Sequence, residues 1–236
     1  MSNIEEKRSF YEMAVFIEHS TLTAKESIMS RKGSLTVISG FSGAGKGTIM
    51  RELLKTHPEY ALSVSVTTRN PRPGEIDGVD YHFISQQQFD ELVENDGLLE
   101  HAGYVDHCYG TPRKYVEEAI AEGKDVLLEI EVQGAMQIKK KRPDTILLFV
   151  TPPSAKELYS RLKGRGTETE EVIRGRMERA CEEAQSMPLY DYLIVNDQLK
   201  EAVELVHRTI QEAKNATIRQ TELMHELTCE LEALKA

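Results

Sequence analysis

The sequence predicts an α/β fold in which a parallel sheet carries helices on both faces. From residue 34 onward, short apolar runs alternate with longer helical patterns, and this alternation is typical of strand–helix–strand units. A glycine-rich loop follows the first apolar run and leads directly into a helical pattern. Residues 63–111 instead hold consecutive strand-like runs with a single helix, which predicts a small α+β lobe inserted into the sheet.

Each element of the main sheet is predicted from its local pattern. Strands are expected at the short apolar runs 34–40, 125–131, 145–150 and 192–195. Helices are expected between them at 46–55, 132–141, 154–163 and 169–185. Ser154 and Thr167 each stand three residues before a glutamate, Glu157 and Glu170, and this capping-box spacing predicts that each begins a helix.

Within the inserted lobe, the strand-like runs lie at 63–68, 79–85 and 98–105. The turn-rich segment RNPRPGEIDG separates the first two runs, and a helix is expected over 86–95 before the third. The pattern suggests a lobe that can move over a cleft.

The two ends of the chain lie outside this scheme. Residues 1–32 are compatible with a helix, and Met29 offers an alternative start just before the first strand. Residues 199–236 show a long helical pattern whose last apolar positions recur at intervals of three, four and three: Met224, Leu227, Leu231 and Leu234. This seam could pair with another chain. Because it spans under two heptads, packing on the chain's own body or on its N-terminal helix is the favoured interpretation.

The amino-acid composition excludes several classes of function. The 236 residues include 29 lysines and arginines against 39 aspartates and glutamates, so a net charge of −10 repels nucleic-acid phosphates. No apolar run approaches the roughly 18–20 residues of a membrane span, and the acidic N-terminal segment is unlike a secretion signal. Cys108, Cys181 and Cys229 are too few and too widely spaced for a disulfide framework or a zinc site. We expect a cytoplasmic protein without nucleic-acid or membrane partners.

One motif carries direct chemistry. Seven consecutive residues fit the G-x-x-x-x-G-K pattern of a P-loop: Gly40, Phe41, Ser42, Gly43, Ala44, Gly45 and Lys46. The glycines let the backbone curl so that successive N–H groups face phosphate oxygens, and the next helix adds partial positive charge. Lys46 supplies a full charge to the β- and γ-phosphates. The predicted fold class is therefore that of the P-loop NTPases.

The motif departs from its usual form at one position. The residue after Lys46 is usually serine or threonine, whose hydroxyl ligates Mg²⁺, but here Gly47 precedes Thr48. Adenylate kinases carry a similar G-K-G-T run, so phosphoryl transfer fits the sequence. We expect Mg²⁺ to arrive with ATP and to be held mainly by water and phosphate, without an assigned protein ligand. None of the seven histidines shows metal-ligand spacing, so all are expected to be surface or core residues.

The predicted lobe contains a second candidate phosphate site. Arg69 and Arg72 lie in one turn, with Tyr81 a little further along the chain. The planar fork of arginine suits bidentate phosphate binding, so this cluster can serve as an anion clamp. A solvated loop has the same sequence signature.

Several motifs occur in the order found in one family. The segments S-V-T-T-R-x-P-R-x-G-E, D-Y-x-F, L-E-H, Y-G-T and G-R-G-T-E-T-E-E resemble those of guanylate kinases. The resemblance implies a guanylate kinase-like domain over 33–214, with a GMP-binding lobe near 63–112 and a helical lid near 154–177. Residues 1–32 and 215–236 would be an N-terminal extension and a helical tail. The implied activity is ATP-dependent, in-line phosphorylation of GMP, and of dGMP, by a monomer or homodimer.

The resemblance also implies a GMP site. Its expected residues are Ser65, Arg69, Arg72, Tyr81, Glu100, Tyr109, Thr111 and Glu129. The two arginines and the two tyrosines would hold the GMP phosphate. The chemistry agrees with guanine, because the Glu100 carboxylate can accept from N1–H and the exocyclic amine while Ser65 or Thr111 donates to O6. Adenine has the opposite pattern and would be disfavoured by a factor of order 10⁴.

Three glutamates in this region have a second interpretation beside a role in nucleotide binding. Glu100 has the alternative of a surface acid at a strand end. Glu129 and Glu131 stand where the family more usually has aspartate. Glu129 is therefore expected to contact either the guanine or the magnesium shell, and Glu131 has an equally good structural interpretation.

The lid carries the remaining catalytic candidates. By resemblance, Arg165 and Arg176 act with Lys46 to balance the negative charge of the transition state, and Arg161 assists. Asn196 matches a position near the adenine of ATP, although a strand-end turn explains it equally. Two other functions stay open: another nucleoside monophosphate kinase, and a catalytically inactive guanylate kinase-like module that binds proteins.

Overall fold

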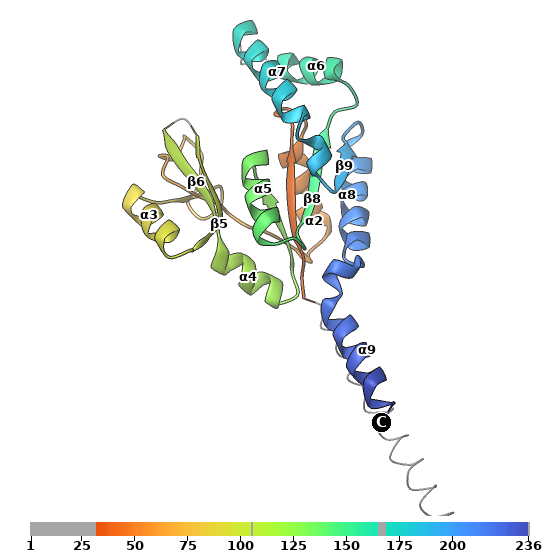
Figure 1. Ribbon diagram of the computed structural model, residues 1–236. Coiled ribbons are helices and arrows are strands. Elements are labelled where there is room, and N and C mark those ends of the chain that lie inside the picture. The colour runs from red at the N-terminus through yellow and green to blue at the C-terminus, as the bar shows by residue number, and fades with distance from the viewer. Residues whose placement is uncertain (1–31, 105, 165–168, 236) are drawn as a thin grey trace, which may run out of the picture. The chain divides into compact units, whose positions relative to one another are not determined.

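The computed structural model describes residues 32–104, 106–164 and 169–235 (Figure 1). The chain divides into two units, which are described separately. The first, Gly33–Gln220, contains both sheets. The second takes in the two ends of the chain, of which Lys32 and residues 221–235 are described. The helix expected within 1–32 therefore falls almost wholly outside the described residues.

A five-stranded parallel sheet forms the centre of the first unit, with strand order β2-β7-β1-β8-β9. Its strands are β1 (Leu35–Gly40), β2 (Tyr60–Leu62), β7 (Asp125–Glu129), β8 (Ile146–Thr151) and β9 (Tyr192–Val195). The first strand lies in the middle, where Val37 pairs with Leu128 on one side and Leu147 on the other. The order reverses at this central strand, so its carboxyl end is a place where α/β proteins bind ligands.

Helices cover both faces of this sheet, as predicted. One face is covered by α2 (Lys46–Thr56), α6 (Ala155–Gly164), α7 (Glu170–Ala184) and α8 (Leu199–Ala213). The other face is covered by α4 (Arg113–Ala121) and α5 (Val132–Lys141) (Figure 1). Successive strand residues point to opposite faces, so Ile38 joins the first core cluster and Val37 the second.

The inserted lobe is a second sheet with one helix. Its strand order is β4-β3-β6-β5, and the elements are β3 (Val66–Thr67), β4 (His82–Phe83), α3 (Gln86–Glu94), β5 (Leu98–Tyr104) and β6 (His107–Pro112). A small core of Val66, Phe89 and Leu98 holds the helix against the strands. Ser85 begins α3 with a complete capping box to Gln88. The α+β lobe inserted into a parallel-sheet domain is therefore confirmed.

Three elements were not predicted. The strand β2 is only three residues long and is paired on one edge, so its local signal is weak. The strand β6 returns from β5 through a turn in which Asp106 has a φ of 62°. The helix α4 follows immediately, and its buried residues Val116, Ala119 and Ile120 have helical spacing that the strand-like neighbourhood obscured.

The two predicted helix starts have different outcomes. The prediction named Thr167 for α7, and in the structure the side chain of Thr169 caps this helix by accepting a hydrogen bond from the N–H of Val172 at 3.4 Å. Thr167 itself lies outside the described residues. At Ser154 the prediction was better, because its Oγ accepts from the N–H of Glu157 at 3.1 Å.

The long C-terminal helix predicted over 199–236 is interrupted. The helix α8 ends at Ala213, a short 3₁₀ turn spans Thr217–Arg219, and α9 runs over Thr221–Ala233. Side chains replace the missing helical hydrogen bonds, since Arg219 donates to the carbonyl of Ala213 at 3.0 Å and Gln220 to that of Lys214 at 2.7 Å. In the second unit, Lys32 pairs with Glu222 near the start of α9.

Candidate active site

The phosphate loop connects β1 to α2 at the carboxyl end of the sheet. Its backbone requires glycine at two positions. At Gly40, φ is 144° and an added Cβ would lie 2.1 Å from the Val150 carbonyl oxygen. At Gly45, φ is 91° and a Cβ would lie 2.5 Å from Nδ2 of Asn196. The loop is therefore packed too tightly for side chains at these positions, which leaves its inner surface to backbone N–H groups.

Lys46 and Asn196 both hold this loop. The Lys46 ammonium donates to the carbonyls of Gly40 at 2.8 Å and Phe41 at 3.2 Å. Asn196 is buried at the end of β9, and its Nδ2 donates to the Ala44 carbonyl at 2.7 Å. The sequence predicted Asn196 for the adenine of ATP, and the structure places its side chain against the P-loop itself.

A cavity of about 410 Å³ joins the P-loop to the inserted lobe. Gly40, Ser42 and Lys46 line it from the loop, while Ser65 and Tyr81 line it from the lobe. Four carboxylates also line it: Asp80, Glu129, Glu131 and Glu183. Part of the predicted donor set and part of the predicted acceptor set thus meet at one space, although they lie far apart in the sequence.

The proposed guanine-reading pair is formed between neighbouring lobe strands. Glu100 on β5 is 5% exposed, and its Oε1 accepts a hydrogen bond of 2.7 Å from the Thr111 hydroxyl on β6. Burial raises the pKa of Glu100, and the hydrogen bond from Thr111 and the charge of Lys141 oppose that rise. This burial contradicts the alternative in which Glu100 is a surface acid.

Gly134 of α5 makes room for this carboxylate. A Cβ on Gly134 would lie 2.6 Å from Oε2 of Glu100 and 3.0 Å from its Cδ. The local sequence around Gly134 does not predict this contact, because only the packing of α5 on β5 brings Gly134 to Glu100.

The residues of the predicted anion clamp lie partly together. Arg69 stands over the ring of Tyr81, with Cζ 5.4 Å from the ring centroid, and the rings of Tyr81 and Tyr109 are 5.9 Å apart. Glu75 holds Arg69 through two hydrogen bonds of 2.9 Å and also accepts from the backbone N–H of Arg72 at 2.7 Å. Arg72 is exposed on the same turn. Glu75 is a second residue that the sequence analysis did not assign, and it orients the turn that carries both arginines.

Glu129 lies beside the residue that departs from the usual P-loop motif. A Cβ on Gly47 would be 3.4 Å from Oε2 of Glu129. The Glu129 side chain is open to the cavity but flanked by protein, and this desolvation raises its pKa against the opposing charges of Lys46 and Arg51. An oxygen donor therefore stands next to the position where the motif usually supplies a hydroxyl, and this donor set suits Mg²⁺.

Glu183 on α7 was also missed by sequence analysis. It lines the same cavity as Ser42 of the P-loop. Burial raises the pKa of Glu183, and the nearby charge of Lys46 opposes the rise. A carboxylate thus lies against a loop whose backbone is suited to bind phosphate.

The lid residues are only partly described. Arg165 lies outside the described residues. Arg176 is half-buried on α7, and Nε of Arg161 donates to Oε1 of Glu157 at 2.8 Å along α6. Arg174 is exposed and pairs with Glu178.

The parallel sheet, the tight glycine loop and the shared cavity define a P-loop protein of the nucleotide kinase class. A family model described as guanylate kinase matches residues 30–213. A guanylate kinase from Latilactobacillus sakei is 50% identical over 184 residues, which are 78% of this chain and 91% of that protein. One from Streptococcus thermophilus is 54% identical over 184 residues, which are 78% of this chain and 88% of that protein. The chain belongs to the guanylate kinase family.

The structural comparison agrees with this assignment. The crystal structure of guanylate kinase from Anaplasma phagocytophilum matches with a TM-score of 0.65 and 31% identity, covering 80% of this chain and 90% of that one. In the part of the chain that the structure describes, we find no helix with the length and apolar character needed to cross a membrane.

Proposed function

We propose that the γ-phosphoryl group of ATP passes to GMP within the cavity between the P-loop and the inserted lobe. As a member of the guanylate kinase family, the chain is a nucleoside monophosphate kinase that phosphorylates GMP to GDP with ATP. The observation that carries the proposed site is the shared cavity, with Lys46 on one side and Ser65 and Tyr81 on the other. Its volume of about 410 Å³ lies in the usual range for small-molecule sites.

On the donor side, the P-loop amides and Lys46 bind the β- and γ-phosphates. The Lys46 ammonium already lies over the loop, so phosphate oxygens can take the place of the carbonyls it now contacts. Arg165 and Arg176 add positive charge from the lid. Asn196 stabilises the P-loop by donating a hydrogen bond to the Ala44 carbonyl. The acceptor oxygen of GMP is already anionic, so aligning the two nucleotides and balancing charge is the protein's main task.

On the acceptor side, Glu100 accepts from the two adjacent guanine donors, and Thr111 and Ser65 contribute hydroxyls. Arg69, Arg72, Tyr81 and Tyr109 bind the GMP phosphate. The buried position of Glu100 supports selection of guanine, since adenine would leave the carboxylate without its donors. GMP phosphate would compete with Glu75 for Arg69, because both are anions on the same guanidinium.

Mg²⁺ bound with ATP would neutralise charge on the β- and γ-phosphates. Glu129 is the residue proposed to hold it, directly or through bound water, because its carboxylate lies beside Gly47. We further propose that residues 63–112 and 154–177 close over the bound nucleotides and exclude water. The three free cysteines and the negative net charge support a cytoplasmic protein that does not bind nucleic acid. We also propose that it is a monomer or a homodimer.

Another nucleoside monophosphate kinase and an inactive protein-binding module are not favoured, because the family match is long and Lys46 stands in an intact loop. The test is a coupled assay of ADP formation with GMP, dGMP, AMP, CMP and UMP. We expect turnover with GMP and dGMP and almost none with the others. Comparable turnover with AMP would contradict the proposed guanine contacts, and the absence of turnover with retained nucleotide binding would contradict the proposed transfer.

A further inference from the structure

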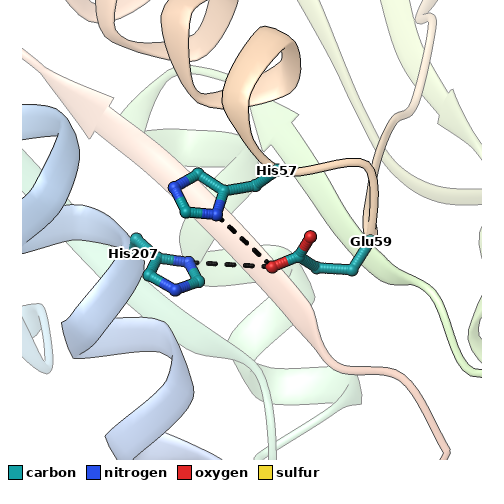
Figure 2. Close-up of side chains that lie close together, drawn as sticks. All are labelled: His57, Glu59 and His207. Carbon is teal, nitrogen blue, oxygen red and sulfur yellow. Dashed lines mark ion pairs between the residues drawn. The ribbon is translucent and has the colours of Figure 1, made fainter.

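Two histidines and a glutamate meet at the end of α2 that lies away from the P-loop (Figure 2). His57 is the C-cap residue of α2, Glu59 lies just before β2, and His207 lies in the middle of α8. One ligand atom from each side chain lies within 4.8 Å of the others. The helix α2 has 11 residues, so the cluster is about 16 Å along its axis from Lys46.

The two histidine side chains converge on one carboxylate oxygen of Glu59. Nδ1 of His57 is 3.5 Å from Oε1 of Glu59, and Nδ1 of His207 is 3.9 Å from the same oxygen (Figure 2). Ligand atoms at the corners of a tetrahedron around Zn²⁺ are separated by about 3.3–3.4 Å, since the bonds are about 2.0–2.1 Å long. The two separations exceed this by about 0.1–0.6 Å, and rotation of the histidine side chains out of their stacked arrangement would close the difference.

We propose that His57, Glu59 and His207 bind one divalent transition-metal ion, of the kind represented by Zn²⁺, Co²⁺ and Ni²⁺. Two imidazoles and a carboxylate are a donor set for such ions, which imidazole nitrogen selects over Mg²⁺ and Ca²⁺. Water would complete the coordination, because the histidine side chains are 21% exposed and that of Glu59 is 43% exposed.

The cluster places one carboxylate against two stacked imidazole rings. The ring centroids are 3.8 Å apart and the ring planes are 16° from parallel. Among the described residues, the recorded ion pairs of Glu59 are with these two histidines. A divalent ion supplies positive charge to the carboxylate while both rings stay neutral.

A neighbouring hydrogen-bond chain determines the tautomer of His207. Gln211 donates to the Tyr60 hydroxyl at 3.2 Å, and that hydroxyl lies 2.9 Å from Nδ1 of His207. When Tyr60 donates, the His207 proton resides on Nε2 and Nδ1 carries a lone pair. Metal binding exchanges this hydrogen bond for a metal–nitrogen bond, and it turns the stacked rings apart because such bonds lie in the ring plane.

The position of the site indicates its effect. The helices α2 and α8 pack on the same face of the sheet. An ion held by His57 and His207 fastens the end of α2 to α8, so metal binding is expected to raise the melting temperature.

The test uses the full chain without a polyhistidine tag, treated with chelator and free of nucleotide. Co²⁺ is titrated by its visible absorption and Zn²⁺ by calorimetry, with Mg²⁺ in excess. The competing pair on α9, His225 and Cys229, has Nε2 3.8 Å from Sγ and is removed in a matched control, His225→Gln. We expect one ion per chain, affinity reduced at least about tenfold in His57→Gln and in His207→Gln, and little change in His225→Gln.

Two controls keep the outcome interpretable. His57→Gln leaves the Tyr60–His207 contact in place, so it reports on ligation if His207→Gln folds poorly. The rate of GMP turnover, measured for each variant without a bound transition-metal ion, verifies that the variant is folded. This rate should stay within about twofold of the parent rate. The proposal is overturned if the parent binds these ions no better than His57→Gln, or if only His225→Gln loses binding.

Discussion

Thr111 donates a hydrogen bond of 2.7 Å to Oε1 of Glu100, and this contact joins neighbouring strands of the inserted lobe. The other carboxylate oxygen faces Gly134 of α5, where a Cβ would be only 2.6 Å away. The carboxylate is therefore hydrogen-bonded on one side and closely packed against α5 on the other before any nucleotide arrives. Such prior orientation reduces the entropy that binding must remove, which is the basis for expecting tight discrimination at this position.

GMP binding should weaken as the pH falls. Burial raises the pKa of Glu100, so protonation begins at a higher pH than for an ordinary glutamate near 4.3. Only the ionised form accepts from both guanine donors, and the GMP dissociation constant should rise as pH drops through that raised pKa. The GMP phosphate also titrates, near pH 6, so Glu100→Gln serves as the control. If the two pH profiles run parallel, the titration of Glu100 is not responsible.

Replacing Gly134 with alanine should impair GMP use. The new Cβ would displace the Glu100 carboxylate, so the KM for GMP should rise by about tenfold or more while that for ATP stays constant. Gly175→Ala on α7 is the matched control, because a Cβ there meets nothing within 4 Å. Thermal melting of Gly175→Ala should show no loss, since alanine favours helices over glycine, whereas Gly134→Ala should melt somewhat lower because its Cβ overpacks the Glu100 site. An unchanged KM for GMP in Gly134→Ala would argue against the proposed role of this packing.

Restoring a hydroxyl after Lys46 should lower the Mg²⁺ requirement. A Cβ at position 47 would be 3.4 Å from Glu129, an ordinary contact, so Gly47→Ser should fit. Its hydroxyl offers the ligand that the usual motif provides. We expect half-maximal activity at a lower free Mg²⁺ concentration in Gly47→Ser than in Gly47→Ala, which adds bulk alone. Equal Mg²⁺ dependence in the two variants would count against a metal position beside Glu129.

Lys46→Ala and Arg72→Ala should fail in different ways. Loss of the Lys46 charge should reduce kcat by about 10²–10³-fold, because this ammonium stabilises the phosphates during transfer. Loss of Arg72 should raise the KM for GMP by about 10–100-fold and leave ATP binding intact, since charged hydrogen bonds contribute about 1.5–3 kcal/mol. Separate titrations with each nucleotide distinguish the two. Unchanged GMP affinity in Arg72→Ala would remove this residue from the acceptor site.

The P-loop could be predicted from the sequence because its determinants lie within a few consecutive residues. The positive φ values of Gly43 and Gly45 and the position of Lys46 all follow from that local motif. The two-faced sheet was also predictable, because apolar strands alternate with amphipathic helices. The short strand β2 was not, since three residues carry almost no periodicity.

Other parts of the site depend on tertiary packing. Gly134 approaches Glu100 only because α5 lies on β5, and Glu183 lines the same cavity as Ser42 although α7 and the P-loop are far apart in the sequence. The contact between His57 and His207 joins residues on α2 and α8, which no spacing rule connects. Glu100 and Thr111 were assigned by resemblance, and the structure places them in hydrogen-bond contact.

The most direct measurement is kcat/KM for GMP and for AMP in the parent and in Glu100→Gln. Glutamine keeps the size of the side chain but turns one acceptor into a donor, which opposes a guanine donor. The parent should prefer GMP by a factor of order 10⁴, and the variant should lose about 10²-fold or more with GMP and little with AMP. Undiminished preference for GMP in Glu100→Gln would contradict the claim that this buried carboxylate reads the guanine.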